Sequence, residues 1–360
     1  MDSERHGLLH RLCLAPGPPG GEDAVRTIVR EALSGTGTIS YDGLGSVVCE
    51  LQGSDDSVRV VLDSHLDEVA FMVQSVSSDG RIAFVPLGGW WGHVLLGQRI
   101  DLLTTNGTVP AVIGCKPPHF LSEEEKTRVL RIDAMYFDVG ASSREQVEKL
   151  GVRVGDMAVP HAIFERMAVD GVISATALDN RIGVALMIEA LNSAAEDAGH
   201  PNTLIGVAAA QEEIGLRGAQ TASTISRPDV ALVLECTPAD DLPGVGEPQG
   251  RLGAGPQLRF YDPTAVANRR FARWIADLAK DKDLPLQHAV RRSGGTNAGA
   301  IHRYGAGIPT AVLGVPARYI HSHVSLMHES DYDNALSLVR QAVASLDAAT
   351  VRGFARFDSP

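Results

Sequence analysis

Five short segments of this chain place histidine or carboxylate side chains beyond an apolar run or at the start of a predicted helix. The apolar runs 58–62, 203–210, 230–234 and 310–315 predict buried strands. The polar side chains that follow these runs, together with one at the start of the predicted helix 177–195, are His65, Asp67, Glu212, Glu213, Glu235, His321 and Asp179. The carboxyl ends of parallel strands open onto a common crevice. The sequence therefore predicts that these side chains converge on one edge of a sheet.

The residue types in this group suit a hydrolytic metal site. Histidine and carboxylate ligands without cysteine are typical of zinc, cobalt or manganese centres. If the ligands are His65, Asp179, Glu213, Glu235 and His321, the three carboxylates bring three negative charges and two divalent ions bring four positive ones. One bridging hydroxide would balance the difference. Without metal the carboxylates would repel one another and their pKa values would rise. The number and charge of the candidate ligands therefore predict two metal ions.

Three acids of the group have distinct predicted roles. Asp179 is the natural bridge, because a carboxylate can give one oxygen to each of two ions. Asp67 lies two residues after His65, where it can accept the second imidazole N–H and fix the tautomer. Glu212 is not needed as a ligand, and a spare carboxylate beside an activated water is what a general base requires.

Each of these residues also has a simpler explanation. His323 is a rival to the second histidine ligand, and Asp63 is a rival to Asp67 as the imidazole support. The acids at 212–213 could be a solvated pair, and Asp179 could be only a helix N-cap. The joint occurrence of these residues at successive strand ends disfavours separate explanations of this kind.

Other catalytic templates are missing from the sequence. It contains no dinucleotide-binding GxGxxG, no phosphate-binding GxxxxGK[ST], no GxSxG and no HExxH. The adjacent acids at 212–213 cannot flank a sugar in the way that a glycosidase requires. The metal-hydrolase interpretation therefore has no competitor among these motifs.

Alternating strands and helices predict the architecture that must position these residues. A predicted helix at 22–34 and predicted strands at 46–51 and 58–62 come first. After about residue 165 predicted strands and helices alternate. The elements predicted there are a helix at 177–195, a strand at 203–210, a helix at 218–226, a strand at 230–234, a helix at 269–281, a strand at 310–315 and a helix at 333–347. We expect an α/β fold with a mostly parallel central sheet flanked by helices.

The middle of the chain has a different pattern. Residues 69–162 contain many short β-like runs separated by turn residues such as Asp79-Gly80, Gly88-Gly89 and Asn106-Gly107. One helix interrupts them, with Ser142 or Ser143 as its expected N-cap before REQVEKL. We expect a small β-barrel or sandwich inserted into the α/β domain. The predicted division is 1–68 and 164–360 for the catalytic domain, with 69–163 as the insert.

Composition argues against some classes of binding partner and indicates a cellular compartment. The 360 residues carry a formal net charge of −12 with no basic stripe, which argues against nucleic acid as a partner. No run approaches 18 apolar residues, so neither a membrane span nor a membrane partner is expected. The four cysteines form no CxxC pair, which excludes a zinc knuckle and a disulfide scaffold. A cytoplasmic protein is the expectation.

Several motifs, in order, resemble those of the M42 metallo-aminopeptidases, the glutamyl or tetrahedral aminopeptidase group. They include DSHLDEVAFMV, LLGQRIDLLTTNG, ALDNRIG, QEEIGLRGA, GGTNAGAIH and RYIHS. The resemblance covers nearly the whole chain. It implies that N-terminal residues are cleaved from short peptides, and that subunits form dimers that build hollow dodecamers.

The same resemblance implies a dinuclear centre. One ion, with zinc or cobalt expected first and manganese next, would be held by His65 and Glu235. The other would be held by Glu213 and His321, and Asp179 would bridge the two. Glu212 would accept the proton of the attacking water.

Two residues depart from the family pattern. Glu235 stands where the family usually has Asp, and Asn297 replaces the Asp of its GTDAG block. The longer Glu235 can still ligate, but acids of different length at this position go with different substrate ends. Asn297 removes a charge that could pair with a substrate amine. These departures motivate a second hypothesis, another metal-dependent amide hydrolase (a deacylase, an amidase or a carboxyl-end peptidase) acting on a small metabolite. A catalytically weakened assembly protein is a third.

Overall fold

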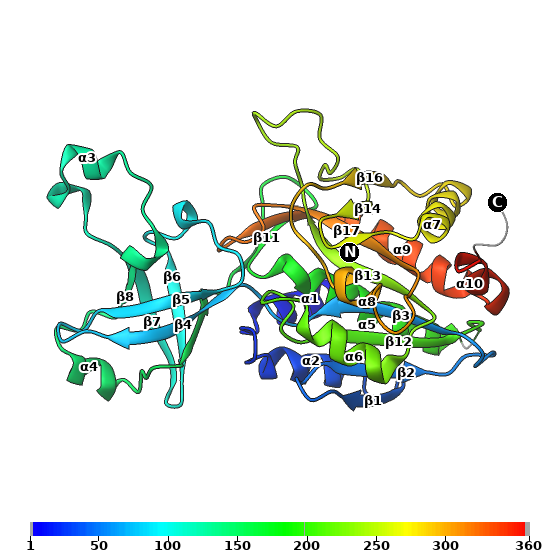
Figure 1. Ribbon diagram of the computed structural model, residues 1–360, viewed down its shortest axis with the longest axis horizontal. Helices are drawn as coiled ribbons and strands as arrows, with labels where there is room; N and C mark the ends of the chain where they lie inside the picture. Colours follow the sequence, from blue (N-terminus) through cyan, green and yellow to red (C-terminus); the bar gives the residue numbers. More distant parts are fainter. Residues whose placement is uncertain (1–2, 198, 357–360) are drawn as a thin grey trace.

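The computed structural model describes residues 3–197 and 199–356. Two parts lie side by side along the longest axis (Figure 1). The larger part is a broad sheet covered by helices, and the smaller is a barrel formed by the cyan and green segments of the chain. Within the described residues, no helix is both long enough and apolar enough to span a membrane.

The central sheet has a parallel core with antiparallel margins. β12 pairs in parallel with β3, β3 with β13, and β13 with β17, while β2, β18 and β14 add to this core in antiparallel fashion. The strands are β1 (Thr38–Tyr41), β2 (Val47–Leu51), β3 (Arg59–His65), β10 (Phe164–Arg166), β11 (Val172–Ala175), β12 (Thr203–Ala209), β13 (Val230–Pro238), β14 (Gln257–Asp262), β15 (Ala265–Val266), β16 (Gln287–Val290), β17 (Thr310–Arg318) and β18 (Ser325–His328). The predicted α/β fold is confirmed, and its parallel pairing is concentrated in the strands that lead to the candidate site.

Helices cover both faces of this sheet. One face carries α1 (Ser3–Leu14), α2 (Asp23–Ala32), α5 (Leu178–Asp197), α7 (Arg269–Asp281), α9 (Glu329–Ser345) and α10 (Ala348–Phe354). The other carries α6 (Arg217–Ser226) and α8 (Ala298–Ile301). Side chains alternate between the two faces: Val60 and Leu62 of β3 join the first core and Val61 joins the second. Burial on both faces explains why these strands are continuous apolar runs.

The smaller part is a closed barrel, which settles the choice between barrel and sandwich. Its strands, in the order β4-β5-β8-β7-β6-β9, close on themselves. They are β4 (Ala70–Val76), β5 (Ile82–Leu87), β6 (Arg99–Thr104), β7 (Gly107–Gly114), β8 (Tyr136–Asp138) and β9 (Met157–Pro160). In its core Phe84 stacks on Phe137, and Phe71 packs edge-on against both rings. Ser143 caps α4 (Arg144–Lys149), as predicted. A second short helix, α3 (Glu123–Lys126), lies at the far end of the barrel.

Strand ends are where the structure differs most from the prediction. β3 continues to His65 and β13 to Pro238, so His65 and Glu235 lie within strands rather than in the loops after them. β17 likewise extends to Arg318. Polar residues end an apolar run in the sequence but do not interrupt backbone pairing. Helix α1 was not predicted, although Leu9, Leu12 and Cys13 lie at helical spacing and are buried. The exact boundaries of the inserted domain stay a prediction.

Candidate active site

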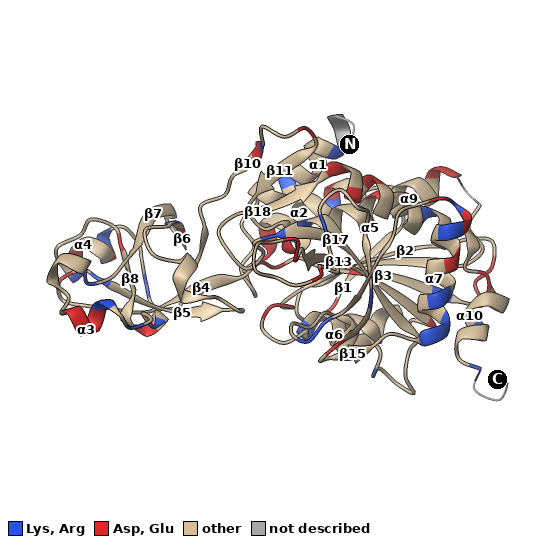
Figure 2. Cartoon of the chain, turned by 90° about the horizontal axis from the view of Figure 1, so that it is seen from above, with Lys and Arg blue, Asp and Glu red and all other residues tan. Residues whose placement is uncertain are grey.

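The carboxyl ends of the parallel strands surround a cavity of about 280 Å³. Acidic residues gather at this end of the sheet, on the side that faces the barrel (Figure 2). The cavity is lined by most of the predicted site residues, namely His65, Asp179, Glu212, Glu213, Glu235 and His321. Parallel pairing brings β3, β12 and β13 to the same edge, which is why residues more than a hundred positions apart in sequence meet there.

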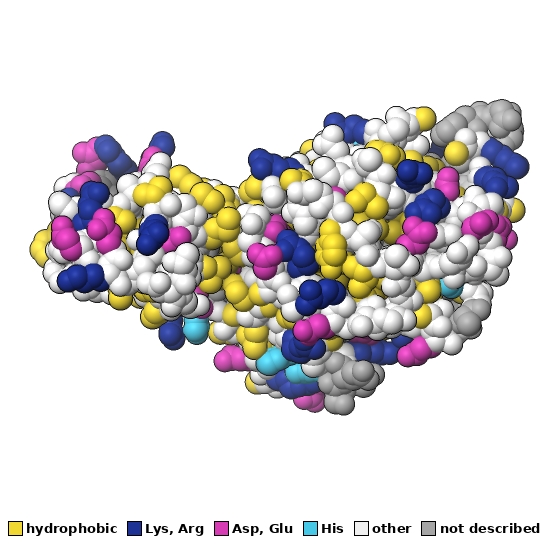
Figure 3. Space-filling view, turned by 90° about the horizontal axis from the view of Figure 1, so that it is seen from below, with side chains coloured by type: hydrophobic (Ala, Val, Ile, Leu, Met, Phe, Trp, Pro, Cys, Tyr) yellow, Lys and Arg dark blue, Asp and Glu magenta, His cyan; other side chains and the backbone are white. Residues whose placement is uncertain are grey.

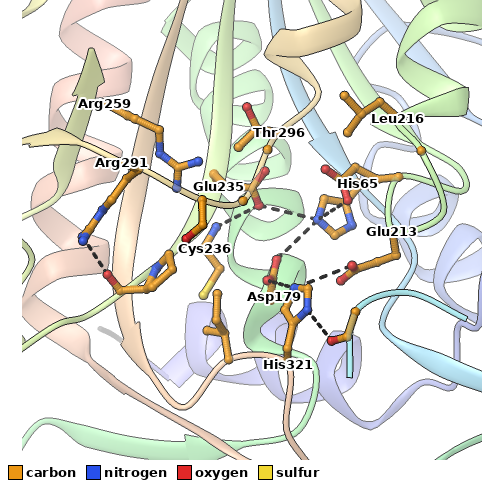
Figure 4. Close-up of a pocket in the computed structure, with 18 residues that line it drawn as sticks. His65, Asp179, Glu213, Leu216, Glu235, Cys236, Arg259, Arg291, Thr296 and His321 are labelled. Carbon is orange, nitrogen blue, oxygen red and sulfur yellow. Dashed lines mark hydrogen bonds and ion pairs between the residues drawn. The ribbon is translucent and has the colours of Figure 1, made fainter. Parts of the chain in front are cut away.

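Asp179 lies at the centre of this group (Figure 4). Its Oδ1 lies 3.4 Å from Nε2 of His65, and its Oδ2 lies 3.4 Å from Nε2 of His321. The two carboxylate oxygens therefore face different imidazoles. This is the geometry that a carboxylate shared between two cations would have.

Two overlapping sets of donor atoms surround Asp179. Glu235 Oε1 lies 3.5 Å and Glu212 Oε2 lies 3.8 Å from Nε2 of His65. On the other side, Glu213 Oε2 lies 3.6 Å from Nε2 of His321. Donor atoms of the three residues His65, Glu212 and Glu235 lie within 4.8 Å of one another, which is close enough to hold one metal ion, as do those of His65, Asp179 and Glu213.

Asp67 joins two of the segments that carry these residues. Its carboxylate oxygens accept hydrogen bonds from the backbone N–H groups of Glu212, at 2.9 Å, and Glu213, at 3.0 Å. Its backbone carbonyl oxygen lies 3.0 Å from Nδ1 of His65, closer than its carboxylate Oδ1 at 3.5 Å. The sequence led us to expect the carboxylate as the acceptor for the imidazole. The carbonyl oxygen is the nearer acceptor, and the carboxylate orients the loop that bears the two glutamates.

The barrel contributes one contact that the sequence analysis missed. Nδ1 of His321 lies 2.8 Å from the carbonyl oxygen of Gly89, in the segment between β5 and β6. A side chain at Gly89 would begin only 3.2 Å from the same imidazole nitrogen. The Gly88-Gly89 pair was interpreted only as a turn. Its close approach to a histidine more than two hundred residues away is visible only in three dimensions.

Burial and mutual contact perturb the acids and imidazoles of the cavity. Burial raises the pKa of Glu212 well above its usual value and that of Glu213 to about 8, although the nearby histidines oppose this. Burial alone would lower the pKa of His321, but Asp179 and Glu213 raise it to about 10. Burial would raise the pKa of Asp179, and its contacts with both imidazoles hold it well below the usual value. The raised pKa values of Glu213 and His321 mean that protons are held in the cavity where metal cations could replace them.

A fully buried arginine connects the segments that carry the candidate ligands. Arg181, two residues after Asp179, donates to the carbonyl oxygens of Leu12 and Ala15 at 2.8 and 3.0 Å and to Glu68 at 3.1 Å. Glu68 follows Asp67 directly in the chain and also accepts from a backbone N–H of the loop after α1. The ion pair therefore connects the start of α5 with the segment after β3, and both carry candidate ligands.

The rival residues lie elsewhere. His323 is buried against Trp90, with ring centroids 5.5 Å apart, and neither of its ring nitrogens has a hydrogen-bond partner in the described part of the chain. Asp63 accepts a hydrogen bond from the amide of Asn297 at 2.7 Å. Asn297 is fully buried and does not line the cavity. The interpretation that Asn297 deprives a substrate amine of a partner is therefore wrong, because this amide faces Asp63.

The comparisons with known proteins agree with this fold. A family model described as M42 glutamyl aminopeptidase matches residues 45–338. The chain belongs to this family of peptidases, and its relatives support assignment as a peptide hydrolase. The glutamyl aminopeptidase of Lactococcus lactis is 36% identical over 86% of this chain and 87% of its own.

Two solved structures extend the comparison to the whole fold. A TET aminopeptidase from a marine sediment Thaumarchaeota archaeon is 40% identical, covers 98% of this chain and 99% of its own, and has a TM-score of 0.95. The Pyrococcus horikoshii TET1 peptidase, described as assembling into a tetrahedron or a large octahedral shell, is 27% identical. It covers 95% of this chain and 100% of its own with a TM-score of 0.84.

Proposed function

We propose that this protein is a dinuclear metal-dependent aminopeptidase acting on short peptides. The observation that carries the proposal is the position of Asp179, whose two oxygens each lie 3.4 Å from a different histidine. His65 and Glu235 would hold one ion, Glu213 and His321 the other, and Asp179 both. The donors are nitrogen and oxygen, which suits zinc, cobalt or manganese. When bound, the ions would polarise the scissile carbonyl and make a water molecule more acidic.

Glu212 is the proposed general base. Its carboxylate lies in the cavity beside His65 and belongs to one of the two donor groups described above, but the ligand sets proposed here are complete without it. It would take the proton of the attacking water and then deliver it to the departing amine. Asp67 supports this role, because its carboxylate accepts a hydrogen bond from the backbone N–H of Glu212 at 2.9 Å. This contact fixes the backbone position from which the Glu212 side chain extends.

Assembly is the second part of the proposal. Hydrophobic side chains gather around the junction of the barrel and the α/β part and on the barrel itself (Figure 3). Exposed ones include Trp91, Phe120 and Val154, each more than 60% exposed. Such patches favour association, and the related TET1 peptidase forms a shell. We therefore propose a homo-oligomer built from dimers, up to a dodecamer. The four free cysteines are compatible with a reducing cytoplasm.

A substrate panel combined with metal analysis tests the function. The protein is reconstituted with zinc, cobalt or manganese and assayed on free aminoacyl p-nitroanilides, their N-acetylated forms and peptides blocked at the carboxyl end. We expect about two metal ions per chain and hydrolysis that needs a free amino group. Preference for blocked amines would instead favour a deacylase or amidase. Fewer than about one ion per chain would favour a catalytically weakened assembly protein.

A further inference from the structure

The loop that carries the two adjacent glutamates, residues 210–217, has unusual backbone geometry where it leaves β12. We call this segment the glutamate loop. Gln211 directly precedes Glu212 and has a φ of +56°, in the left-handed region. A residue with a side chain adopts this conformation at a cost, and it persists where surrounding contacts fix it. The carbonyl oxygen of Gln211 accepts from the backbone N–H of Arg217 at 3.3 Å, which closes the loop. The direction in which Glu212 leaves the strand is therefore set at Gln211.

The backbone N–H of Gln211 donates to a carboxylate from a distant part of the chain. Oε1 of Glu22 accepts from this N–H at 3.1 Å and from that of Gly20 at 2.7 Å. The Glu22 side chain is 1% exposed, and its other oxygen lies 3.5 Å from Nη2 of Arg26. Glu22 stands at the N-cap of α2, but within the described residues its side chain accepts no hydrogen bond from the backbone of that helix. A side chain at this position commonly caps its own helix, whereas that of Glu22 joins the glycine-rich turn at 16–21 to the glutamate loop.

The glycine-rich turn is held at both ends by buried acids. The backbone N–H of Gly17 donates to Glu68 at 3.0 Å, and that of Gly20 donates to Glu22 at 2.7 Å. Glu68 is in turn paired with the fully buried Arg181 at 3.1 Å. Gly20 has a φ of +86°, a conformation that glycine adopts without strain. Glu22 is therefore presented to Gln211 from a fixed backbone.

Three consecutive backbone N–H groups of the glutamate loop donate to two buried carboxylates. Glu22 accepts from residue 211, and Asp67 accepts from residues 212 and 213. Burial raises the pKa of Glu22, and the N–H groups that donate to it oppose this. Neither carboxylate lines the cavity. Both can therefore act on the site only through the backbone that they hold.

We propose that Glu22 is a positioning residue that sets the direction of Glu212 through the backbone N–H of Gln211. The inference rests on the proposed role of Glu212 as general base. A base must lie within hydrogen-bond reach of the proton that it takes, and a displacement of about 1 Å can lower the rate by about 100-fold. Reach is decisive here, because one oxygen of Glu22 must contact two N–H groups. Glutamine at position 22 retains such an oxygen, whereas aspartate retains the charge but is one methylene shorter.

Variants at position 22 separate reach from charge. At saturating metal, Glu22→Asp and Glu22→Ala should each lower kcat by about 10- to 100-fold, while Glu22→Gln should remain within about threefold of the wild-type value. If Glu22→Ala does not fold, the contrast between Glu22→Asp and Glu22→Gln still tests the proposal.

Asp331→Ala is the matched control. Asp331 on α9 is fully buried, accepts from the backbone N–H groups of Gly253 and Gly255 at 2.7 Å each, and does not line the cavity. Its loss should lower stability but leave kcat within about twofold, because it removes a buried acid that holds a different turn.

Two further readouts distinguish positioning from general destabilisation. If Glu22 acts through Glu212, adding Glu22→Asp to Glu212→Gln should lower kcat by no more than about twofold beyond Glu212→Gln alone. Hydrogen exchange with mass spectrometry reports on the loop without any catalysis. The peptide that spans the glutamate loop should contain one amide, that of Gln211, that exchanges about 10- to 100-fold faster in Glu22→Asp than in the wild-type protein.

The outcomes separate the positioning role from the proposed function. Equal kcat in all position-22 variants, unchanged exchange of the loop, or losses that multiply fully in the double variant would each overturn the role of Glu22 while leaving the peptidase function intact. If the metal-loaded wild-type protein hydrolyses no peptide substrate, the proposed function fails. The exchange rates then decide by themselves whether Glu22 holds the loop.

Discussion

Replacing Asp67 with asparagine tests how the candidate ligands are held. The carboxylate of Asp67 is fully buried and accepts one backbone N–H from Glu212 and one from Glu213. Asparagine has nearly the same shape but only one carbonyl oxygen. Its amide N–H groups would face a backbone N–H, so one bond is lost and the other becomes neutral.

The expected magnitude follows from these two bonds. A hydrogen bond to a charged group contributes about 1.5–3 kcal/mol, and a neutral one about half of that. Losing one charged bond and weakening the other lowers the free energy of unfolding by about 2–4 kcal/mol. Glu213 would also lose its fixed backbone position. Changes to groups that orient ligands usually lower metal affinity by about 10- to 100-fold, and we expect the same here.

Two measurements on one preparation check this prediction. Urea unfolding of the metal-free protein gives the change in stability, and competition with a chelator gives metal affinity. Asp101→Asn is the matched control, because Asp101 also lies beside a histidine, His161, at 3.0 Å, but in the barrel. It should leave metal affinity unchanged. If Asp67→Asn binds metal as tightly as the wild-type protein and unfolds at the same urea concentration, Asp67 does not organise the site.

Three further predictions follow from the same site. Glu212→Gln should retain its metal content in elemental analysis but lose about 10²–10⁴ in kcat, because the general base is removed; unchanged kcat would exclude this role. Arg181→Met should lower the free energy of unfolding by about 3–5 kcal/mol, because it leaves the buried Glu68 unpaired; the double variant Glu68→Gln/Arg181→Met should recover part of the loss, and a purely additive result would contradict the pairing. The pKa values of Glu213 and His321 are raised from 4.5 to about 8 and from 6.5 to about 10, so their protonated forms stabilise the metal-free fold at low pH and that contribution disappears as pH rises through these values. Metal-free protein should therefore unfold at lower urea at about pH 9 than at about pH 6, while metal binding, which displaces these protons, should strengthen over the same range; a flat profile in both would refute the assignment.

Local pattern was sufficient for the elements that bury apolar side chains periodically. The helix predicted at 269–281 has those bounds in the structure. Ser143 is the N-cap of α4, the helix expected to begin directly after that serine. The parallel strands of the core were found from continuous apolar runs, which occur because both faces are covered. Helix α1 and the short marginal strands were missed because their stability comes from contacts with distant elements rather than from their own sequence.

The candidate ligands were predictable for a similar reason. All but Asp179, which lies at the start of α5, follow an apolar run in the sequence, and parallel strands leave little choice about where the ends of such runs meet. Arg259 and Arg291, which also line the cavity, gave no such signal, since each lies in a segment without a recognisable motif. Asn297 was misinterpreted because its position in a motif does not determine the direction of its side chain, which the packing of α8 turns towards Asp63.

The sequence by itself determined the fold class and the family and proposed a set of candidate metal ligands, because strand periodicity and motif order are properties of the chain alone. Only the tertiary structure decided how these side chains face one another. It placed the oxygens of Asp179 between two histidines, assigned the carboxylate of Asp67 to the backbone of the glutamate loop, and brought Gly89 from the barrel to His321. Contacts of this kind depend on the register and packing of segments far apart in the chain, and no local pattern records them.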